Sequence, residues 1–194
     1  EVNAAVANVK DMSSGATGSV RLGLSAADTN MDVLSVAIGK EAGKTNMGAR
    51  AVAIGTSAGK TDMGDYSVSV GILAGEQNQS TYAVAVGSSA GQTGQGQYGL
   101  ALGGYAGKDN QAIGAISIGG YSAMTSQGEY AVAIGYATAQ ATQPANSIAI
   151  SASGTATGTT PSSSNSILIG KSNTSVKIGD GNVQSVSDAR DKYD

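Results

Sequence analysis

The chain of 194 residues contains no cysteine, histidine, tryptophan or phenylalanine, and only two prolines. Without cysteine it forms no disulfide, thiolate nucleophile or zinc–thiolate site. Without histidine it lacks the commonest acid–base group and metal ligand. These absences disfavour most enzyme classes. A core built on large aromatic side chains is also excluded, because tyrosine is the only aromatic residue present.

Charge and hydropathy disfavour two kinds of partner. The formal net charge is −3 and 13% of the residues are charged, so the chain has neither a basic footprint for nucleic acid nor a polybasic segment for an anionic membrane. No apolar run approaches the roughly 18 to 20 residues of a membrane span, and the N-terminus lacks the pattern of a signal peptide. We therefore expect no nucleic-acid partner and no membrane insertion. The start at Glu1 rather than Met favours a fragment or a processed product.

Glycine, by contrast, is abundant, with 29 residues or about 15% of the chain, roughly twice the usual share. It belongs to a sequence repeat with a constant period of 16. Ser-Val-Ala-Ile-Gly at 35–39 returns as Ala-Val-Ala-Ile-Gly at 51–55 and in five further units up to 131–135. Degenerate units occupy 19–23 and 147–151, and after an insertion rich in Ser, Thr and Gly the motif restarts at 166–170, three residues out of phase.

A unit of this length is too short for a strand–helix–strand unit, which needs about 30 residues. The repeat therefore predicts an all-β fold, a parallel β-roll or solenoid with 16-residue coils. Strands of successive coils then pair in parallel about 4.8 Å apart, and about nine coils make a rod on the order of 40 Å long.

Each strand has two faces that differ in side-chain size. One face carries large aliphatic residues in two columns, as in Val36 and Ile38, and the other carries small residues, as in Ala37 and Ala101. A thin coil encloses only one of these faces, so we expect the other to meet further copies of the chain. We take the small face as the contact between chains, in which case Ala101→Arg is expected to break the oligomer.

The turn side of the unit also forms columns. Ala-Gly pairs such as Ala42–Gly43 suggest a second short strand and its corner. A glutamine column predicts a ladder of amide hydrogen bonds between coils; it contains Gln79, Gln95, Gln111, Gln127 and Gln143. A tyrosine column is a candidate binding site for glycan rings, because tyrosine joins a flat apolar body to a polar tip. The alternative is that these rings cover the coil edge or an interface; the column contains Tyr66, Tyr82, Tyr98 and Tyr130.

Three motifs resemble ligand sites but lack the required context. The GxGxxG pattern at 94–99 opens a strand instead of following one, and the phosphate-loop-like segment 55–61 has one residue too few and recurs with the structural period. The calcium-loop-like segment 28–32 lacks the turn glycine and the final glutamate. Fourteen dispersed acidic residues nominate no catalytic carboxylate pair. We expect no cofactor and no metal.

The repeated Ser-Val-Ala-Ile-Gly core followed by Ala-Gly resembles the YadA-like head repeats of trimeric autotransporter adhesins. The resemblance covers roughly residues 19–170. It implies a homotrimer of parallel β-rolls that displays a binding surface on a stalk.

The C-terminal segment is similar to a second family. Val-Lys-Ile-Gly-Asp-Gly-Asn-Val at 176–183, followed by Ser-Asp-Ala-Arg-Asp-Lys at 187–192, resembles the start of endosialidase-type intramolecular chaperone domains of bacteriophage tail fibres and tailspikes. That resemblance implies self-cleavage before Ser187, with Ser187 as nucleophile and Asp188 as its partner. Asp191 departs from the apolar residue usual at that place in the family.

These observations divide the chain into four parts. Residues 1–18 form a neck or an irregular first coil, 19–156 the β-roll repeats, 157–183 an insertion and terminal repeat, and 184–194 the start of a chaperone-like segment. The leading hypothesis is a non-enzymatic, extracellular segment of a phage tail fibre within the virion. It is expected to contact other fibre proteins and a host-surface glycan or protein receptor. The alternatives are a bacterial surface adhesin head, a glycan-degrading tailspike and an ice-binding solenoid.

Overall fold

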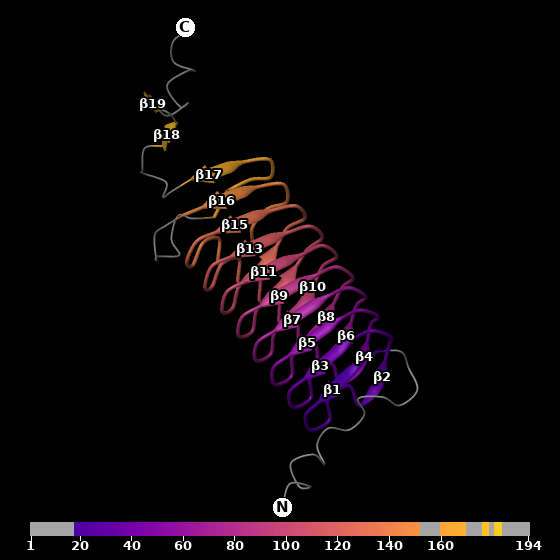
Figure 1. Cartoon of the computed structure of the whole chain (residues 1–194). Helices are drawn as coiled ribbons and strands as arrows, with labels where there is room; N and C mark the ends of the chain where they lie inside the picture. The colour runs from indigo at the N-terminus through magenta and orange to yellow at the C-terminus, as the bar shows by residue number, and fades with distance from the viewer. Residues whose placement is uncertain (1–17, 152–159, 170–175, 179–180, 184–194) are drawn as a thin grey trace, which may run out of the picture.

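The computed structural model describes residues 18–151, 160–169, 176–178 and 181–183. Over these residues the chain is all-β and winds into a solenoid of stacked coils, in which equivalent positions of neighbouring coils are 16 apart in sequence (Figure 1). The described residues include no helix that is long and apolar enough to cross a membrane. The fold class predicted from the period is confirmed.

Each coil from β1 to β14 contributes one three-residue strand to each of two sheets, and β15, β16 and β17 extend the first sheet alone. Sheet A has ten strands: β1 (Val20–Leu22), β3 (Val36–Ile38), β5 (Val52–Ile54), β7 (Val68–Val70), β9 (Val84–Val86), β11 (Leu100–Leu102), β13 (Ile116–Ile118), β15 (Val132–Ile134), β16 (Ile148–Ile150) and β17 (Ile167–Ile169). Sheet B has seven: β2 (Thr29–Met31), β4 (Thr45–Met47), β6 (Thr61–Met63), β8 (Gln77–Gln79), β10 (Thr93–Gln95), β12 (Asp109–Gln111) and β14 (Thr125–Gln127).

Within each sheet the strands are parallel, and positions one period apart lie directly beside one another. Ala37 pairs with Ala53, for example, and Thr45 with Thr61. The additional residues before the last unit do not end the sheet. β17 pairs with β16, with Ile167 beside Ile148, so the extra length is taken up outside the paired strands.

The interior of the coil is filled by small residues of sheet A facing long residues of sheet B. The central position of the sheet A strands is alanine or serine and is fully buried from Ala37 to Ala149. Opposite it, sheet B supplies Met47 and Met63 in the early coils and a glutamine in the later ones. The prediction that the small face lies between chains is therefore wrong. That face closes the core, and the aliphatic columns point outward.

The predicted glutamine ladder is confirmed inside this core. From Gln79 to Gln127, each side-chain amide nitrogen donates to the amide oxygen of the next glutamine, at 3.1 Å from Gln79 to Gln95 and 3.0 Å from Gln95 to Gln111. The same nitrogen of Gln95 also donates to the carbonyls of Val84 and Gly99. No buried side-chain polar atom of the described residues lacks a hydrogen-bond partner.

Glycine follows every sheet A strand from β1 to β15, where no side chain fits, and Ser151 takes this place after β16. Gly71 has φ +131°, and a Cβ on it would lie 2.7 Å from the carbonyl oxygen of Gly87 in the next coil. Such a φ is readily available only to glycine. At Gly71 and its equivalents, glycine therefore allows the coils to stack at strand spacing.

The second strand lies further along the chain than the Ala-Gly pairs suggest. Ala42 is buried, but Gly43 has φ +53°, which an extended strand does not allow, and β4 begins only at Thr45. The Ala-Gly pairs occupy the turn from sheet A to sheet B. A Cβ at Gly91, in the same column, would lie 2.6 Å from Oε1 of Gln95, so this turn packs directly onto the core.

Toward the C-terminus, β18 (Val176–Ile178) and β19 (Gly181–Val183) form an antiparallel pair. Residues 1–17 of the predicted neck and the whole chaperone-like segment 184–194 lie outside the described residues.

Candidate interaction surfaces

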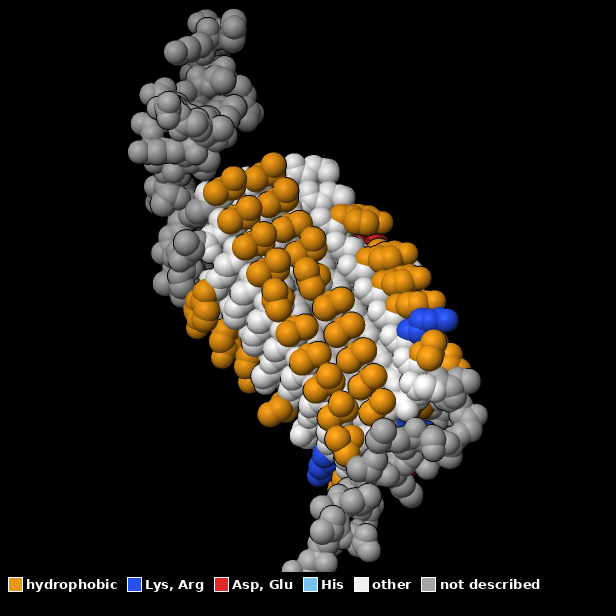
Figure 2. Space-filling view, viewed as in Figure 1, with side chains coloured by type: hydrophobic (Ala, Val, Ile, Leu, Met, Phe, Trp, Pro, Cys, Tyr) orange, Lys and Arg blue, Asp and Glu red, His pale blue; other side chains and the backbone are white. Residues whose placement is uncertain are grey.

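The outer side of sheet A is a continuous aliphatic face. Its two columns run from Val20 and Leu22 in β1 to Ile167 and Ile169 in β17, without a polar residue in either. Figure 2 shows these two columns as adjacent rows of hydrophobic side chains along the rod. Leu102 is 42% exposed and Ile167 68%. Contiguous apolar patches of a few hundred Å² often serve in binding, so this face is a candidate interaction surface.

Three of the four predicted tyrosines lie together. The rings of Tyr66 and Tyr82 stack with centroids 5.0 Å apart, and those of Tyr82 and Tyr98 at 5.3 Å. Arg50 continues the column, with its guanidinium 5.3 Å from the ring centre of Tyr66 and a hydrogen bond of 3.0 Å to its hydroxyl. Because the rings cover one another, the ladder presents ring edges and hydroxyls outward.

The fourth tyrosine stands apart from this stack. Gly114 takes the place of a tyrosine between Tyr98 and Tyr130, and a Cβ on Gly114 would lie 2.7 Å from Cδ1 of Tyr130. The ring of Tyr130 therefore bends over the glycine. Binding of glycan rings by this column stays a prediction.

A second tyrosine group was not singled out from the sequence. Tyr105 and Tyr121 stack at 5.0 Å, and Tyr136 meets Tyr121 edge-on at 5.8 Å. These residues follow the strands of sheet A, whereas Tyr66, Tyr82 and Tyr98 precede them. The sequence feature that indicates this group is the spacing of one full period between Tyr105 and Tyr121. The two groups lie at opposite edges of the aliphatic face.

The outer side of sheet B is polar and carries a shallow groove. Two adjoining hollows of about 350 and 440 Å³ share Asn46 and Met63 in their walls. Along the groove Asn30 donates to Asn46 at 2.9 Å, and Asn46 donates to Asp62 at 2.7 Å. One amide or carboxylate per coil therefore lines the surface.

The threonine column that an ice-binding face requires is interrupted. Thr45 and Thr61 pair with each other, but the next residue in register is Gln77, and Asp109 follows Thr93. The array is therefore neither uniform nor continuous along the sheet.

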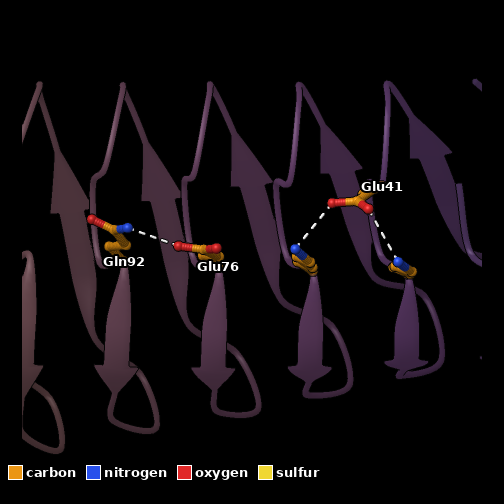
Figure 3. A network of polar contacts seen from close by, with 5 residues as sticks. Glu41, Glu76 and Gln92 are labelled. Carbon is orange, nitrogen blue, oxygen red and sulfur yellow. Dashed lines mark hydrogen bonds and ion pairs between the residues drawn. The ribbon is translucent and has the colours of Figure 1, made fainter. Parts of the chain in front are cut away.

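A small charged network lies on one side of the early coils. The carboxylate of Glu41 contacts Nζ of Lys44 and of Lys60, both at 3.0 Å (Figure 3). The hydrogen bond from Lys60, followed by that from Lys44, lowers the pKa of Glu41 to about 2, and Glu41 raises the pKa of Lys60. Further along, Gln92 donates to Glu76 at 2.7 Å. These side chains are partly exposed, and the network joins neighbouring coils.

The described residues supply no further chemical site. They contain no group of three or more acidic residues placed to hold a metal ion. The predicted self-cleavage residues, Ser187 and Asp188, lie outside the described part of the chain.

Comparisons of the chain with protein-family models, with curated proteins and with solved structures find no match.

Proposed function

We propose that the chain is a structural and adhesive segment of a trimeric phage tail fibre, in which the aliphatic face of sheet A meets two further copies and the polar face of sheet B points outward. The observation that carries the proposal is the uninterrupted aliphatic face over ten strands. Burial of apolar surface is the main driving force for association, and the coil interior holds mostly alanine, serine, methionine and glutamine. The resemblance to YadA-like heads supports three copies, and that to the chaperone domains supports a phage fibre.

The function that follows is mechanical and multivalent. Parallel strands bonded coil to coil make a stiff spacer, and three copies present each weak surface site three times at a fixed distance. The same rod suits the head of a bacterial trimeric autotransporter adhesin. The self-cleavage assigned to Ser187 and Asp188 belongs to the chaperone resemblance and is not an activity of the rod.

The native mass of the chain tests the assembly. Light scattering coupled to size exclusion is expected to give about three times the protomer mass of 18.9 kDa. A monomer with the circular dichroism of a folded β protein contradicts the proposal, because the aliphatic face would then remain in water.

The groove on sheet B is the proposed receptor surface. It offers one amide or carboxylate per coil, about 4.8 Å apart, to a polymer with repeating hydroxyl groups. Binding to purified bacterial surface polysaccharides is expected to weaken in Asp62→Gly and Asn46→Gly. Asn110→Gly is the matched control, since Asn110 occupies the same column outside the groove and Gly94 shows that the column accepts glycine. Equal binding by all three variants contradicts this assignment.

A further inference from the structure

The aliphatic face alone is narrow for a stable contact. Ten strands at about 4.8 Å spacing span ~43 Å, and three residues at about 3.3 Å give a width of ~10 Å. The footprint is therefore ~430 Å², whereas a stable interface covers about 800 Å² on each partner. If copies of this chain associate through sheet A, as proposed above, the contact has to extend past the strands onto the flanking columns.

Both flanking columns carry exposed hydrophobic side chains. The column two residues before each sheet A strand from β3 to β15 is here named the tyrosine edge; it contains Leu34, Arg50, Tyr66, Tyr82, Tyr98, Gly114 and Tyr130. The column two residues after each of the same strands is named the far edge; it contains Lys40, Thr56, Ile72, Ser88, Gly104, Gly120 and Tyr136. Tyr66 and Ile72, which flank β7, are 43% and 57% exposed, and Tyr130 and Tyr136, which flank β15, are 59% and 54% exposed.

The two edges match one another at equal height along the rod. Tyr66 is level with Ile72 and Tyr130 with Tyr136, so large apolar groups meet large apolar groups. Between them, Tyr82 and Tyr98 are level with the small residues Ser88 and Gly104. No residue of the tyrosine edge faces a like charge at the same height on the far edge. Arg50 is at the height of Thr56, and Lys40 is at the height of Leu34.

Symmetry decides which edges come into contact. Rotation about an axis parallel to the rod sets the tyrosine edge of one copy against the far edge of the next at the same height. An antiparallel pair would instead set tyrosine edge against tyrosine edge. It would also set far edge against far edge, which in a centred pair brings Lys40 toward Tyr136.

We propose that copies of the chain associate in parallel and in register, and that the tyrosine edge of each packs against the far edge of its neighbour. The stacked tyrosines are then contacts between protomers, and the groove of sheet B stays free for other ligands. This inference rests on the proposed self-assembly and adds its orientation, its register and the residues of the seam.

Paired cysteines test the seam, because the natural chain has none. In Tyr66→Cys/Ile72→Cys, strand β7 separates the two positions within one chain by about 10 Å, beyond the reach of a disulfide. A disulfide in this variant therefore joins two chains. Tyr66→Cys/Tyr136→Cys is the matched control, because those positions are offset by four coils or ~19 Å. Under mild oxidation we expect about tenfold more cross-linked chain from the level pair than from the offset pair, because only the level pair shares a high effective concentration.

Other outcomes overturn the inference in distinguishable ways. Efficient cross-linking by Tyr66→Cys alone indicates antiparallel association. An oligomer of unchanged mass in which the level pair does not cross-link removes the seam but leaves the proposed assembly. Absence of any oligomer removes both the seam and the proposed assembly.

Nitration of the unmodified protein tests the seam without cysteine substitutions. Tyr66 and Tyr130 should react several-fold more slowly in the oligomer than in a dissociated Leu102→Arg variant, and equal rates overturn the inference.

Discussion

Arginine at Ala101 and arginine at Leu102 should have opposite consequences, because these neighbours in β11 point to opposite sides of the coil. Ala101 is fully buried, whereas Leu102 is 42% exposed on the aliphatic face. The first substitution puts a long cation into the core, and the second puts it on the outer surface. The pair therefore separates coil folding from association.

The expected magnitudes differ several-fold. Overpacking costs about 1–3 kcal/mol and an unpaired buried charge several kcal/mol more, so Ala101→Arg should lose over ~5 kcal/mol. That loss is comparable to the whole net stability of a domain. Leu102→Arg gives up roughly half of the transfer free energy of one leucine, about 1 kcal/mol. It should leave the coil folded but introduce one charge per copy into the proposed contact.

Two measurements on each variant distinguish an effect on coil folding from an effect on association. Thermal unfolding followed by circular dichroism should show a lost or strongly lowered transition for Ala101→Arg. Leu102→Arg should keep a cooperative transition, lowered by the stabilisation that assembly adds to the natural protein. Light scattering should then show a monomer for Leu102→Arg. A stably folded Ala101→Arg protein refutes the assignment of the small face to the interior, and a fully assembled Leu102→Arg protein refutes the aliphatic contact.

Three further outcomes follow from the coil. Gly71→Ala should destabilise the protein by about 3 kcal/mol or more, because the left-handed φ and the close carbonyl both oppose a Cβ; urea unfolding measures this loss, and an unchanged midpoint contradicts it. Gln111→Met should cost about 2–4 kcal/mol, because it removes the amide bonds that join three coils, again measured in urea. The ion pairs of Glu41 should stabilise the fold above pH 4.5 and be lost as the pH falls toward 2, because the folded state lowers the pKa of this group. Melting temperatures at low salt should show this fall in the natural protein and a smaller one in Glu41→Gln, and high salt should reduce the difference because these partly exposed charges are screened.

The period alone was sufficient to predict the parallel sheets and their register. A constant repeat length places equivalent positions of neighbouring coils side by side, so the period predicts the columns through Ala37 and Thr45. The glutamine ladder followed from the same argument, because buried amides that recur at strand spacing satisfy one another.

The direction of each face could not be obtained from the alternation within a strand. Both faces of Val36–Ala37–Ile38 are apolar, so local hydropathy does not distinguish inside from outside. The decision comes from volume. Met63 and the glutamines of sheet B already fill the interior, which leaves room only for alanine or serine opposite them. The residues that decide which face of a sheet A strand is buried therefore lie in sheet B and not in the strand itself.

The surface features were predicted least completely. Tyr66, Tyr82 and Tyr98 were visible as a column, but their stacking and their place beside the aliphatic face depend on where the coil turns. Tyr136 follows Tyr121 one position short of a full period and so falls outside a strict column, although the rings meet. The sheet B groove depends on backbone geometry at Asn46 and Asp62, which have positive φ.

Because the period is constant, the length of the rod is set by the number of coils. Removal of any one full period, such as 83–98, shortens the solenoid by about one strand spacing of 4.8 Å and returns every remaining side chain to its own column. A deletion one position longer or shorter than a period would rotate the remainder of the coil and set core residues against solvent. The reach of such a segment can therefore change in discrete steps of one coil, while the chemistry of its faces stays the same.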